Sequence, residues 1–273
     1  KYIMLKTHFM KRIYIFILFL VNTFFIVAQT NTDANGKKQG YWKKVDPTSK
    51  KIIYEGLFKD DKPQGLFKYY YPNDSIKAKM LFVQNGKIGY STMYHPTGKK
   101  MAYGKYINEV KDSVWTYYDE NGILISKETF VLGKKNGVVY TYFQDGIVSE
   151  EHTYKLDVMH GPFKQYYNKT TLKAEGNYIN GQLDGKNAYY YPNNVAAAFG
   201  YYKNGVKNGP WVYKEKDGKI KEKELYTLGK LANKKETDDF FNKNKVKEET
   251  PKTEEKKGKT NSKPNTNKPK GNK

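Results

Sequence analysis

The sequence predicts an all-β fold, an elongated single-layer antiparallel sheet of about eight stacked β-hairpin repeats of 24 residues. Three observations predict it. A small residue returns at a fixed interval through most of the chain, as in repeat proteins. Short segments rich in Tyr, Phe, Trp, Val and Ile flank Asn-Gly and Asp-Gly pairs, which favour tight hairpin turns. In the second segment of each repeat, apolar and polar residues alternate with the period of a strand.

The small residue that opens each aromatic segment marks the repeat. The first interval between these anchors is 25 residues and the other six are 24. The anchors are Gly40, Gly65, Gly89, Ser113, Gly137, Gly161, Gly185 and Gly209. A period of this size indicates an array in which each unit buries surface against its neighbours.

Each repeat is predicted to be strand, turn, strand. In one second strand, Ala174, Gly176 and Tyr178 are expected to share a face, with Glu175 pointing away from it. Small residues in the middle of such a face leave room for a Trp or Phe from a neighbouring strand. Because a lone hairpin is marginal in water, we expect the hairpins to stack into a single row.

Aromatic residues recur at three places in the repeat, and these columns are the predicted structural sites and the candidate binding surface. The column two positions after the anchor contains Trp42, Phe67, Trp115, Phe163 and Trp211; the column five positions after it contains Tyr70, Tyr94, Tyr118, Tyr142, Tyr166 and Tyr190; the column in the second strand contains Phe58, Phe82, Tyr106, Phe130, Tyr154, Tyr178, Tyr202 and Tyr226. The columns are expected to form cross-strand ladders. Looser packing is expected at Ser91, Val139 and Asn187, which interrupt the first column.

Residues 10–28 are predicted to be a signal peptide. Lys11 and Arg12 precede an apolar segment over residues 13–27, and Ala28 followed by Gln29 is the expected cleavage site. The apolar segment is shorter than the roughly 20 residues of a membrane-spanning helix, and an uncleaved membrane anchor is the alternative. The protein is therefore expected to be exported, as a periplasmic, envelope-associated or secreted protein. It contains no cysteine, which excludes disulfides and a lipid-anchor cysteine.

A short linker is expected over residues 29–39, followed by the repeat array over residues 40–233. Beyond it, residues 234–273 are rich in Lys, Asn, Thr and Pro and contain few apolar residues. Such a composition predicts a disordered lysine-rich tail. Within it, residues 237–241 are a candidate cap over the last hairpin, since repeat arrays need their ends covered.

The chain has a formal charge of +21, which comes from lysine rather than arginine. Arg12 is the one arginine in the sequence, and arginine is the usual residue for reading bases and phosphates. Nucleic acid is therefore an unlikely partner. The lysines are interpreted as solubilising side chains on exposed strands, with an anionic glycan or lipid surface as the alternative partner.

No pattern of catalytic or ligand-binding residues emerges from the sequence. His152 and His160 fall in one repeat, but their spacing matches no metal-ligand set. Glu151 and Glu175 share a strand position with lysines of other repeats, which indicates charge pairing on a solvated face rather than an acid pair. The sequence predicts no catalytic residues, no cofactor and no metal, and the protein is not expected to be an enzyme.

The segments Tyr106–Tyr118 and Tyr202–Tyr213 follow the pattern Y-x-N-G-x-x-x-G-x-W-x-Y-Y with local departures. This pattern resembles the MORN repeat, and in particular the longer bacterial variant often labelled YwqK-like antitoxin. The resemblance covers residues from Gly40 to about Asn233. The resemblance implies a row of stacked hairpins.

Three functions remain open at this stage. The first is an exported, non-catalytic binding or scaffold protein that mediates protein–protein interaction or self-association. The alternative is binding of a cell-envelope polysaccharide or an anionic lipid surface, which the lysine excess would favour. The resemblance also implies an antitoxin-like neutralising partner, which fits an exported protein poorly and is ranked lowest.

Overall fold

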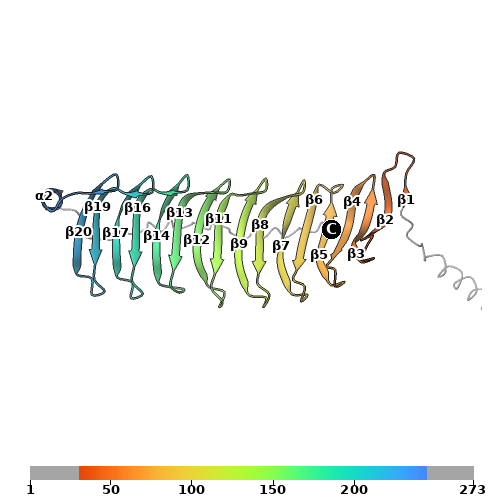
Figure 1. The fold of residues 1–273 in the computed structure, drawn as a ribbon, viewed down its shortest axis with the longest axis horizontal. Helices are drawn as coiled ribbons and strands as arrows, with labels where there is room; N and C mark the ends of the chain where they lie inside the picture. The colour runs from red at the N-terminus through yellow and green to blue at the C-terminus, as the bar shows by residue number, and fades with distance from the viewer. Residues whose placement is uncertain (1–30, 245–273) are drawn as a thin grey trace, which may run out of the picture.

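The fold is taken from a computed structural model, which describes residues 31–244. Within that range the chain forms one open antiparallel sheet in which successive long strands pair in chain order, and the short strands β10, β15 and β18 pair with the strand that precedes them. Figure 1 shows the hairpins side by side in a single layer, with the N-terminal strands at one end and helix α2 at the other. The predicted fold class is confirmed.

The elements have the following bounds. They are β1 (Asn31–Thr32), β2 (Lys38–Val45), β3 (Ile52–Lys59), β4 (Lys62–Tyr70), β5 (Ile76–Val83), β6 (Ile88–Tyr94), β7 (Lys100–Ile107), β8 (Val110–Tyr118), β9 (Leu124–Val131), β10 (Lys134–Lys135), β11 (Gly137–Tyr142), β12 (Val148–Lys155), β13 (Val158–Tyr166), β14 (Leu172–Ile179), β15 (Gln182–Leu183), β16 (Gly185–Tyr190), β17 (Ala196–Lys203), β18 (Val206–Lys207), β19 (Gly209–Lys214), β20 (Ile220–Thr227), β21 (Lys230–Leu231) and α2 (Lys234–Asn244).

Turn residues close the hairpins as the sequence predicts. In the turn between β8 and β9, the Asp119 carboxylate accepts hydrogen bonds from the backbone N–H groups of Asn121 and Ile123, both at 2.8 Å. In the link between β14 and β15, Asn180 and Gly181 have φ angles of 49° and 82°. Such positive φ values match the twist of a tight hairpin and are favourable for Asn and Gly.

The anchor glycine marks a β-bulge rather than a plain strand residue. Gly65 has a φ of 68°, and the register of β4 against β3 shifts beside it, between Glu55 and Leu57. Gly89 differs, because β6 pairs with β5 in regular register. There the positive φ angles lie in the link itself, at residues 84–86. One link of the array therefore has a different geometry from those that carry the bulge.

The three aromatic columns divide between the two faces of the sheet. Phe67 packs edge-to-face with Phe58 and Phe82, each at 5.1 Å between ring centroids, so the first and third columns share one face. We call it the ring face. Tyr70 instead hydrogen-bonds Glu55, which points away from the ring face. The opposite surface, which carries the tyrosine column, is called the tyrosine face.

Glycines on the ring face lie directly under large rings. A Cβ at Gly56 would come within 2.5 Å of the Phe67 ring, and one at Gly104 within 2.3 Å of Trp115. Trp115 is fully buried, and its indole Nε1 donates to the carbonyl of Lys105 at 3.0 Å. The expectation that small residues leave room for a neighbouring Trp or Phe is therefore confirmed.

Both ends of the array differ from the predicted boundaries. The expected linker, residues 29–39, contains β1, which pairs with β2. The first eleven residues of the expected tail form helix α2, because Asn233 caps it by accepting the N–H of Glu236 at 2.9 Å. Residues 245–273, the predicted signal peptide and the expected cleavage site at Ala28 and Gln29 lie outside the described residues.

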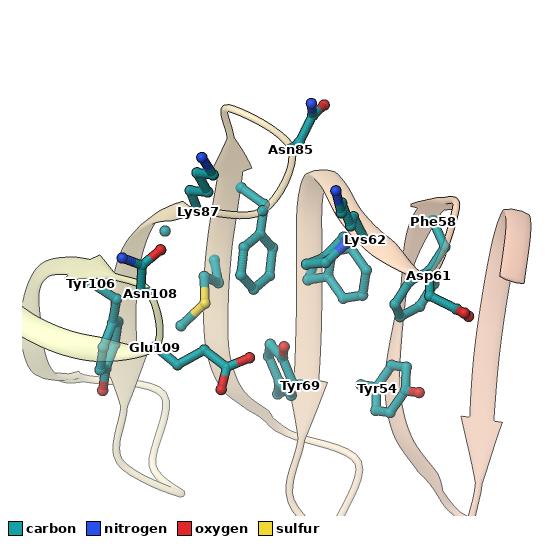
Figure 2. Close-up of a pocket in the computed structure, with 16 residues that line it drawn as sticks. Tyr54, Phe58, Asp61, Lys62, Tyr69, Asn85, Lys87, Tyr106, Asn108 and Glu109 are labelled. Carbon is teal, nitrogen blue, oxygen red and sulfur yellow. The ribbon is translucent and has the colours of Figure 1, made fainter. Parts of the chain in front are cut away.

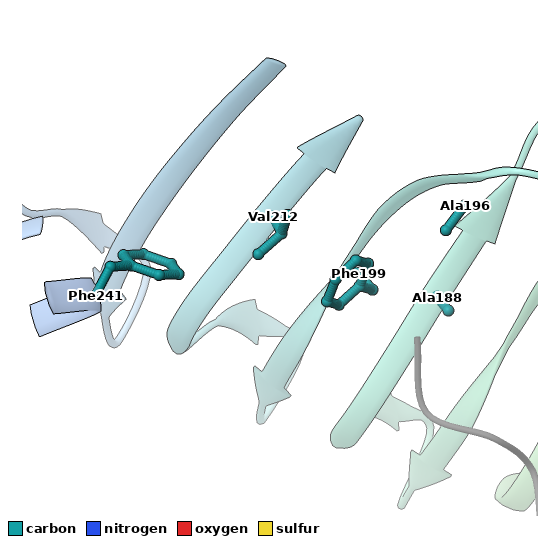
Figure 3. Packing of buried hydrophobic residues seen from close by; sticks show 5 residues of the cluster. All are labelled: Ala188, Ala196, Phe199, Val212 and Phe241. Atoms are coloured by element: carbon teal, nitrogen blue, oxygen red, sulfur yellow. The ribbon is translucent and has the colours of Figure 1, made fainter. Parts of the chain in front are cut away.

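The helix covers the last hairpin, so a cap is present where the sequence placed a candidate. Phe241 of α2 reaches back to a buried cluster on β16, β17 and β19 (Figure 3). Its buried members on the sheet are Ala188, Ala196, Phe199 and Val212. Covering this apolar surface gives the last strands the burial that an interior repeat obtains from its neighbour.

Candidate functional site

Lysine side chains lie over the aromatic rings in several repeats. Lys111 Nζ lies 4.8 Å from the centroid of Trp115 and 5.1 Å from those of Tyr117 and Phe130. It also donates a hydrogen bond to the Tyr117 hydroxyl at 2.7 Å. An ammonium at these distances is attracted by the negative faces of the rings. We call this arrangement of one lysine and three rings a lysine cage.

A second lysine cage has the same form near the C-terminal end of the array. Lys207 Nζ lies 4.8 Å from Trp211, 5.1 Å from Tyr213 and 4.9 Å from Tyr226. It donates to the Tyr213 hydroxyl at 2.5 Å. Lys38 and Lys135, at the same position two residues before the anchor, also lie over rings.

The environment of the first lysine cage is partly desolvated. Burial lowers the pKa of Lys111 below its ordinary value, although the charge of Glu128 acts in the opposite direction. Burial also raises the pKa of Tyr117, with Glu128 adding to the effect. The cage therefore holds a protonated phenol against an ammonium that has lost part of its hydration.

In the repeat of Phe67, whose side chain is 2% exposed, a cavity opens beside the equivalent place. A cavity of about 840 Å³ is lined by Phe67, Tyr69 and Phe82, together with Tyr54 on the neighbouring strand. We call these four rings the open cage. Figure 2 shows the rings along the floor, with the polar residues that border the cavity around them. These polar rim residues are Asp61, Lys62, Asn85, Lys87, Asn108 and Glu109.

Local sequence differences explain why this cage is open. Pro63 stands two residues before the anchor Gly65, where Lys111 stands before Ser113, and a proline ring is too short to cover three aromatic rings. Ser91 replaces the aromatic residue of the next repeat, and it faces Met80 across the strands. The looser packing expected at Ser91 thus coincides with a cavity on the neighbouring hairpin.

Away from the buried cluster around Phe199 and Val212 at its C-terminal end, the tyrosine face is organised by hydrogen bonds and ring contacts. Glu55 accepts hydrogen bonds from Tyr41 and Tyr70, each at 2.6 Å. These bonds lower the pKa of Glu55, while burial and the contact with Glu55 raise the pKa values of both tyrosines to about 12. In the same way, Glu151 accepts a hydrogen bond from Tyr166 at 2.8 Å and Glu175 accepts one from Tyr190 at 2.7 Å.

Lysines occupy the same strand position in other repeats. Lys79 lies 5.8 Å from the Tyr94 ring and Lys127 lies 5.9 Å from the Tyr142 ring. The expected charge pairing across strands is also present, since Lys68 contacts Glu55 at 3.5 Å. The expected tyrosine ladder is therefore wrong in one respect: these tyrosines contact the preceding repeat's acid or lysine. The column spacing of 24 residues separates one tyrosine from the next by two strands.

Apolar side chains form an exposed row on the tyrosine face of the N-terminal hairpins. Leu66 is directly opposite Leu81 in the β4–β5 register, and Leu81 is opposite Tyr90 in the β5–β6 register. Together with Leu57, these side chains are between 45% and 52% exposed. We call these four residues the apolar row. A contiguous apolar surface of this kind marks an interaction site in many soluble proteins.

The predicted site residues are thus brought together in part. The structure joins the first and third columns in the ring face and places the tyrosine column on the other side. Sequence reasoning did not identify the lysines two positions before the anchor, although their recurrence at Lys38, Lys111, Lys135 and Lys207 is visible in the sequence. Within residues 31–244, no three His, Asp or Glu side chains are grouped so that they could hold a metal ion. No helix in that range is long and apolar enough to cross a membrane.

These features define a class of protein: an open, single-layer array of stacked β-hairpins. Three segments of the chain, residues 63–84, 111–131 and 135–156, match the family model described as the MORN repeat variant. These three segments therefore match the MORN repeat variant, as the sequence pattern predicted.

Comparison with complete proteins adds little. No curated protein matches the chain. Among solved structures, one match is a chain of "Crystal Structure of TcdB2-TccC3-TEV", at 9% sequence identity and a TM-score of 0.18. The match covers 74% of this chain, and it covers 15% of the length of that chain.

Proposed function

We propose that this protein is an exported, non-catalytic scaffold that binds a protein partner on the tyrosine face of its N-terminal hairpins. The observation that carries the proposal is the apolar row, Leu57, Leu66, Leu81 and Tyr90, because these side chains are half exposed on neighbouring strands. Burying them against a partner would be favourable by about 25 cal/mol for each Å² of apolar surface removed from water.

Polar groups around the apolar row suit a protein interface. Lys68 and Lys79 are cross-strand neighbours on the same face, and Glu55 is paired with Lys68. An apolar centre with a charged border is the usual organisation of a protein–protein interface. The stacked hairpins hold these groups on a continuous hydrogen-bonded sheet, so little side-chain or backbone ordering is needed on binding.

Export is part of the proposal and rests on the sequence. The predicted signal peptide at residues 10–28 and the absence of cysteine support a protein that leaves the cytosol without a lipid anchor. The size of the protein before and after secretion, measured by mass spectrometry, tests this part. A mature chain that starts at Gln29 is expected, and a chain that keeps residues 10–28 would contradict cleavage.

Substitution in the apolar row tests the binding proposal. Leu66→Asp combined with Leu81→Asp should abolish capture of the partner from an extract of the producing cells, because two charges would be buried at the interface. Leu132→Asp is the matched control, since Leu132 is 78% exposed in a link outside the apolar row. Circular dichroism checks that both variants keep the sheet.

Light scattering on the full chain separates a foreign partner from self-association. A dimer that dissociates in the Leu66→Asp and Leu81→Asp variant would identify a second copy of the chain as the partner. If the double variant captures the same proteins as the unchanged chain and has the same mass in solution, the proposed surface is wrong.

A further inference from the structure

We infer that the open cage beside Pro63 is a binding site for a primary alkylammonium group, such as a lysine side chain or a small amine. The inference rests on a comparison inside the molecule. The chain places an ammonium over three rings at Lys111 and again at Lys207, and it offers the same rings without a lysine at Phe67, Tyr69 and Phe82. It does not depend on the scaffold function, because the cavity lies on the ring face.

The ring arrangement of the open cage matches that of the lysine cages. Phe67 and Phe82 are 5.1 Å apart and meet edge to face, and Phe67 is 6.3 Å from Tyr69. In the Lys111 cage, the corresponding Trp115 and Tyr117 are 6.2 Å apart. The two ring pairs have similar spacing, so both can present their negative faces to an ammonium.

The open cage also offers a hydroxyl to an N–H donor. In the lysine cages, the ammonium donates to Tyr117 or Tyr213. Tyr69 stands at the corresponding position, where burial raises its pKa and keeps it protonated. This hydroxyl favours a primary ammonium, which has N–H groups to donate, over a quaternary one.

A carboxylate completes the site from a neighbouring hairpin. The lysine cages have Glu128 or Glu224 close to the ammonium, and Met80 occupies that position in the open cage. Glu109, in the link between β7 and β8, lines the same cavity, and Figure 2 shows its carboxylate turned towards Tyr69. An acid at this place compensates the charge that a bound ammonium would bring into the cavity.

Two lysines also border the cavity, and they stand at its upper rim. Figure 2 shows Lys62 and Lys87 in the upper part of the view, where both border the cavity. Asp61 and Glu109 balance their charge, so the cavity border is neutral in sum. The rings and the Tyr69 hydroxyl, rather than a net negative field, are therefore expected to select the ligand.

The test uses n-butylammonium, which is the lysine side chain without its backbone. With the full chain labelled at its methionine methyl groups, the Met80 methyl should shift on titration, with a dissociation constant on the order of 1 mM. The neutral analogue 1-butanol should bind at least ten times more weakly. If 1-butanol binds as well as the amine, the cavity is an apolar pocket and the inference is overturned.

Two substitutions connect the signal to the cage. Pro63→Lys supplies the missing lysine and should weaken n-butylammonium binding at least tenfold by filling the cage. Leu81→Lys is its matched control, because it adds the same charge on the tyrosine face of the same hairpin and should leave binding unchanged. Glu109→Gln should weaken binding several-fold without altering the fold.

The outcomes also separate this inference from the scaffold proposal. Leu81→Lys is expected to weaken binding of the protein partner and to leave amine binding unchanged. Pro63→Lys is expected to weaken amine binding and to leave partner binding unchanged. Equal weakening by both lysine substitutions, or no amine binding at all because a rim lysine closes the cage itself, would overturn the inference.

Three forms of the ligand identify its source. Free n-butylammonium represents a small amine, Nα-acetyl-lysine amide represents a protein side chain, and vesicles containing phosphatidylethanolamine represent a lipid headgroup. The source of the ligand is identified by the form that binds the unchanged chain most tightly and whose binding is lost in the Pro63→Lys variant.

Discussion

The Lys111 cage and the open cage are the same structure with and without its central charge. Their residues are 48 positions apart, which is two repeats, so Phe67, Tyr69 and Phe82 correspond to Trp115, Tyr117 and Phe130. Lys111 lies over Trp115, Tyr117 and Phe130, and Pro63 stands at the corresponding position beside the open cage. The comparison teaches that a regular array can create a cavity by changing a few side chains and the geometry of one link.

The largest expected difference between the two cages concerns their central rings. Trp115→Ala should destabilise the protein by about 3–5 kcal/mol, because the indole is fully buried and packed on Gly104. Phe67→Ala should cost less, since a buried phenyl ring removes less apolar surface from water than a buried indole. Urea unfolding followed by circular dichroism measures both. A larger loss in Phe67→Ala would show that the open cage is the better packed of the two.

The glycine beneath the ring gives the next largest effect. Gly104→Ala places a Cβ 2.3 Å from the Trp115 ring, and we expect a loss of about 1–3 kcal/mol as the indole is displaced. Gly89→Ala is the comparison near the open cage, where the nearest atom is the Met80 sulfur at 3.1 Å. Methionine is flexible, so this variant should lose less than about 1 kcal/mol in the same unfolding measurement. Equal losses would contradict the difference in packing.

The tyrosines of the two cages should make stability depend on alkaline pH. Burial raises the pKa of both Tyr117 and Tyr69. Above about pH 10 the unfolded chain loses its phenol protons while the folded chain keeps them, so stability should fall as pH rises further. Tyr117→Phe should reduce this fall more than Tyr69→Phe does. At about pH 8, Tyr117→Phe should cost ~1 kcal/mol for the lost hydrogen bond from Lys111.

Urea titrations at about pH 8 and about pH 11 measure this dependence. Tyr90→Phe serves as the control, because Tyr90 is exposed on the tyrosine face and should change neither value by much. Stability that stays constant up to about pH 11 in the unchanged chain would contradict the prediction.

The smallest effect on stability is expected from opening the closed cage. Lys111→Ala removes ring contacts but also relieves the desolvation that lowers the lysine pKa, so the net change should stay within about 1 kcal/mol. It should nevertheless create a second n-butylammonium site, reported by the methyl group of Met93, which packs against the buried cluster that contains Trp115. Lys134→Ala is the control, and an unresponsive Met93 would show that the rings do not form a cage by themselves.

Much of the fold was predictable because the relevant signals are local. Positive φ angles at Asn180 and Gly181, and the Asp119 carboxylate that accepts two backbone N–H groups, follow directly from the residue types in the turns. The period predicted the stacking, and the glycines under the rings follow from the same alternation. The division of Phe67 and Tyr70 between two faces was also within reach, since three residues apart on a strand means opposite sides.

The candidate sites were less predictable, because they depend on where long side chains fold. Lys111 could extend into solvent from its strand, and only the packed rings and the Tyr117 hydroxyl decide that it lies across them. Glu109 reaches the open cage from the link after β7, three strands along the sheet from Phe67, a distance that no short sequence window covers. The helix at the start of the expected tail depends in a similar way on distant contacts, since Phe241 of α2 packs on the last strands of the sheet.

The sequence by itself determined the period of the array, the places of its turns and the alternation of its strands, because each depends on backbone preferences of a few adjacent residues. Only the tertiary structure decided which rings are covered by a lysine and which remain open, because that outcome depends on contacts between neighbouring hairpins. Pro63 becomes the border of a cavity only once Phe67, Tyr69 and Phe82 are assembled beside it.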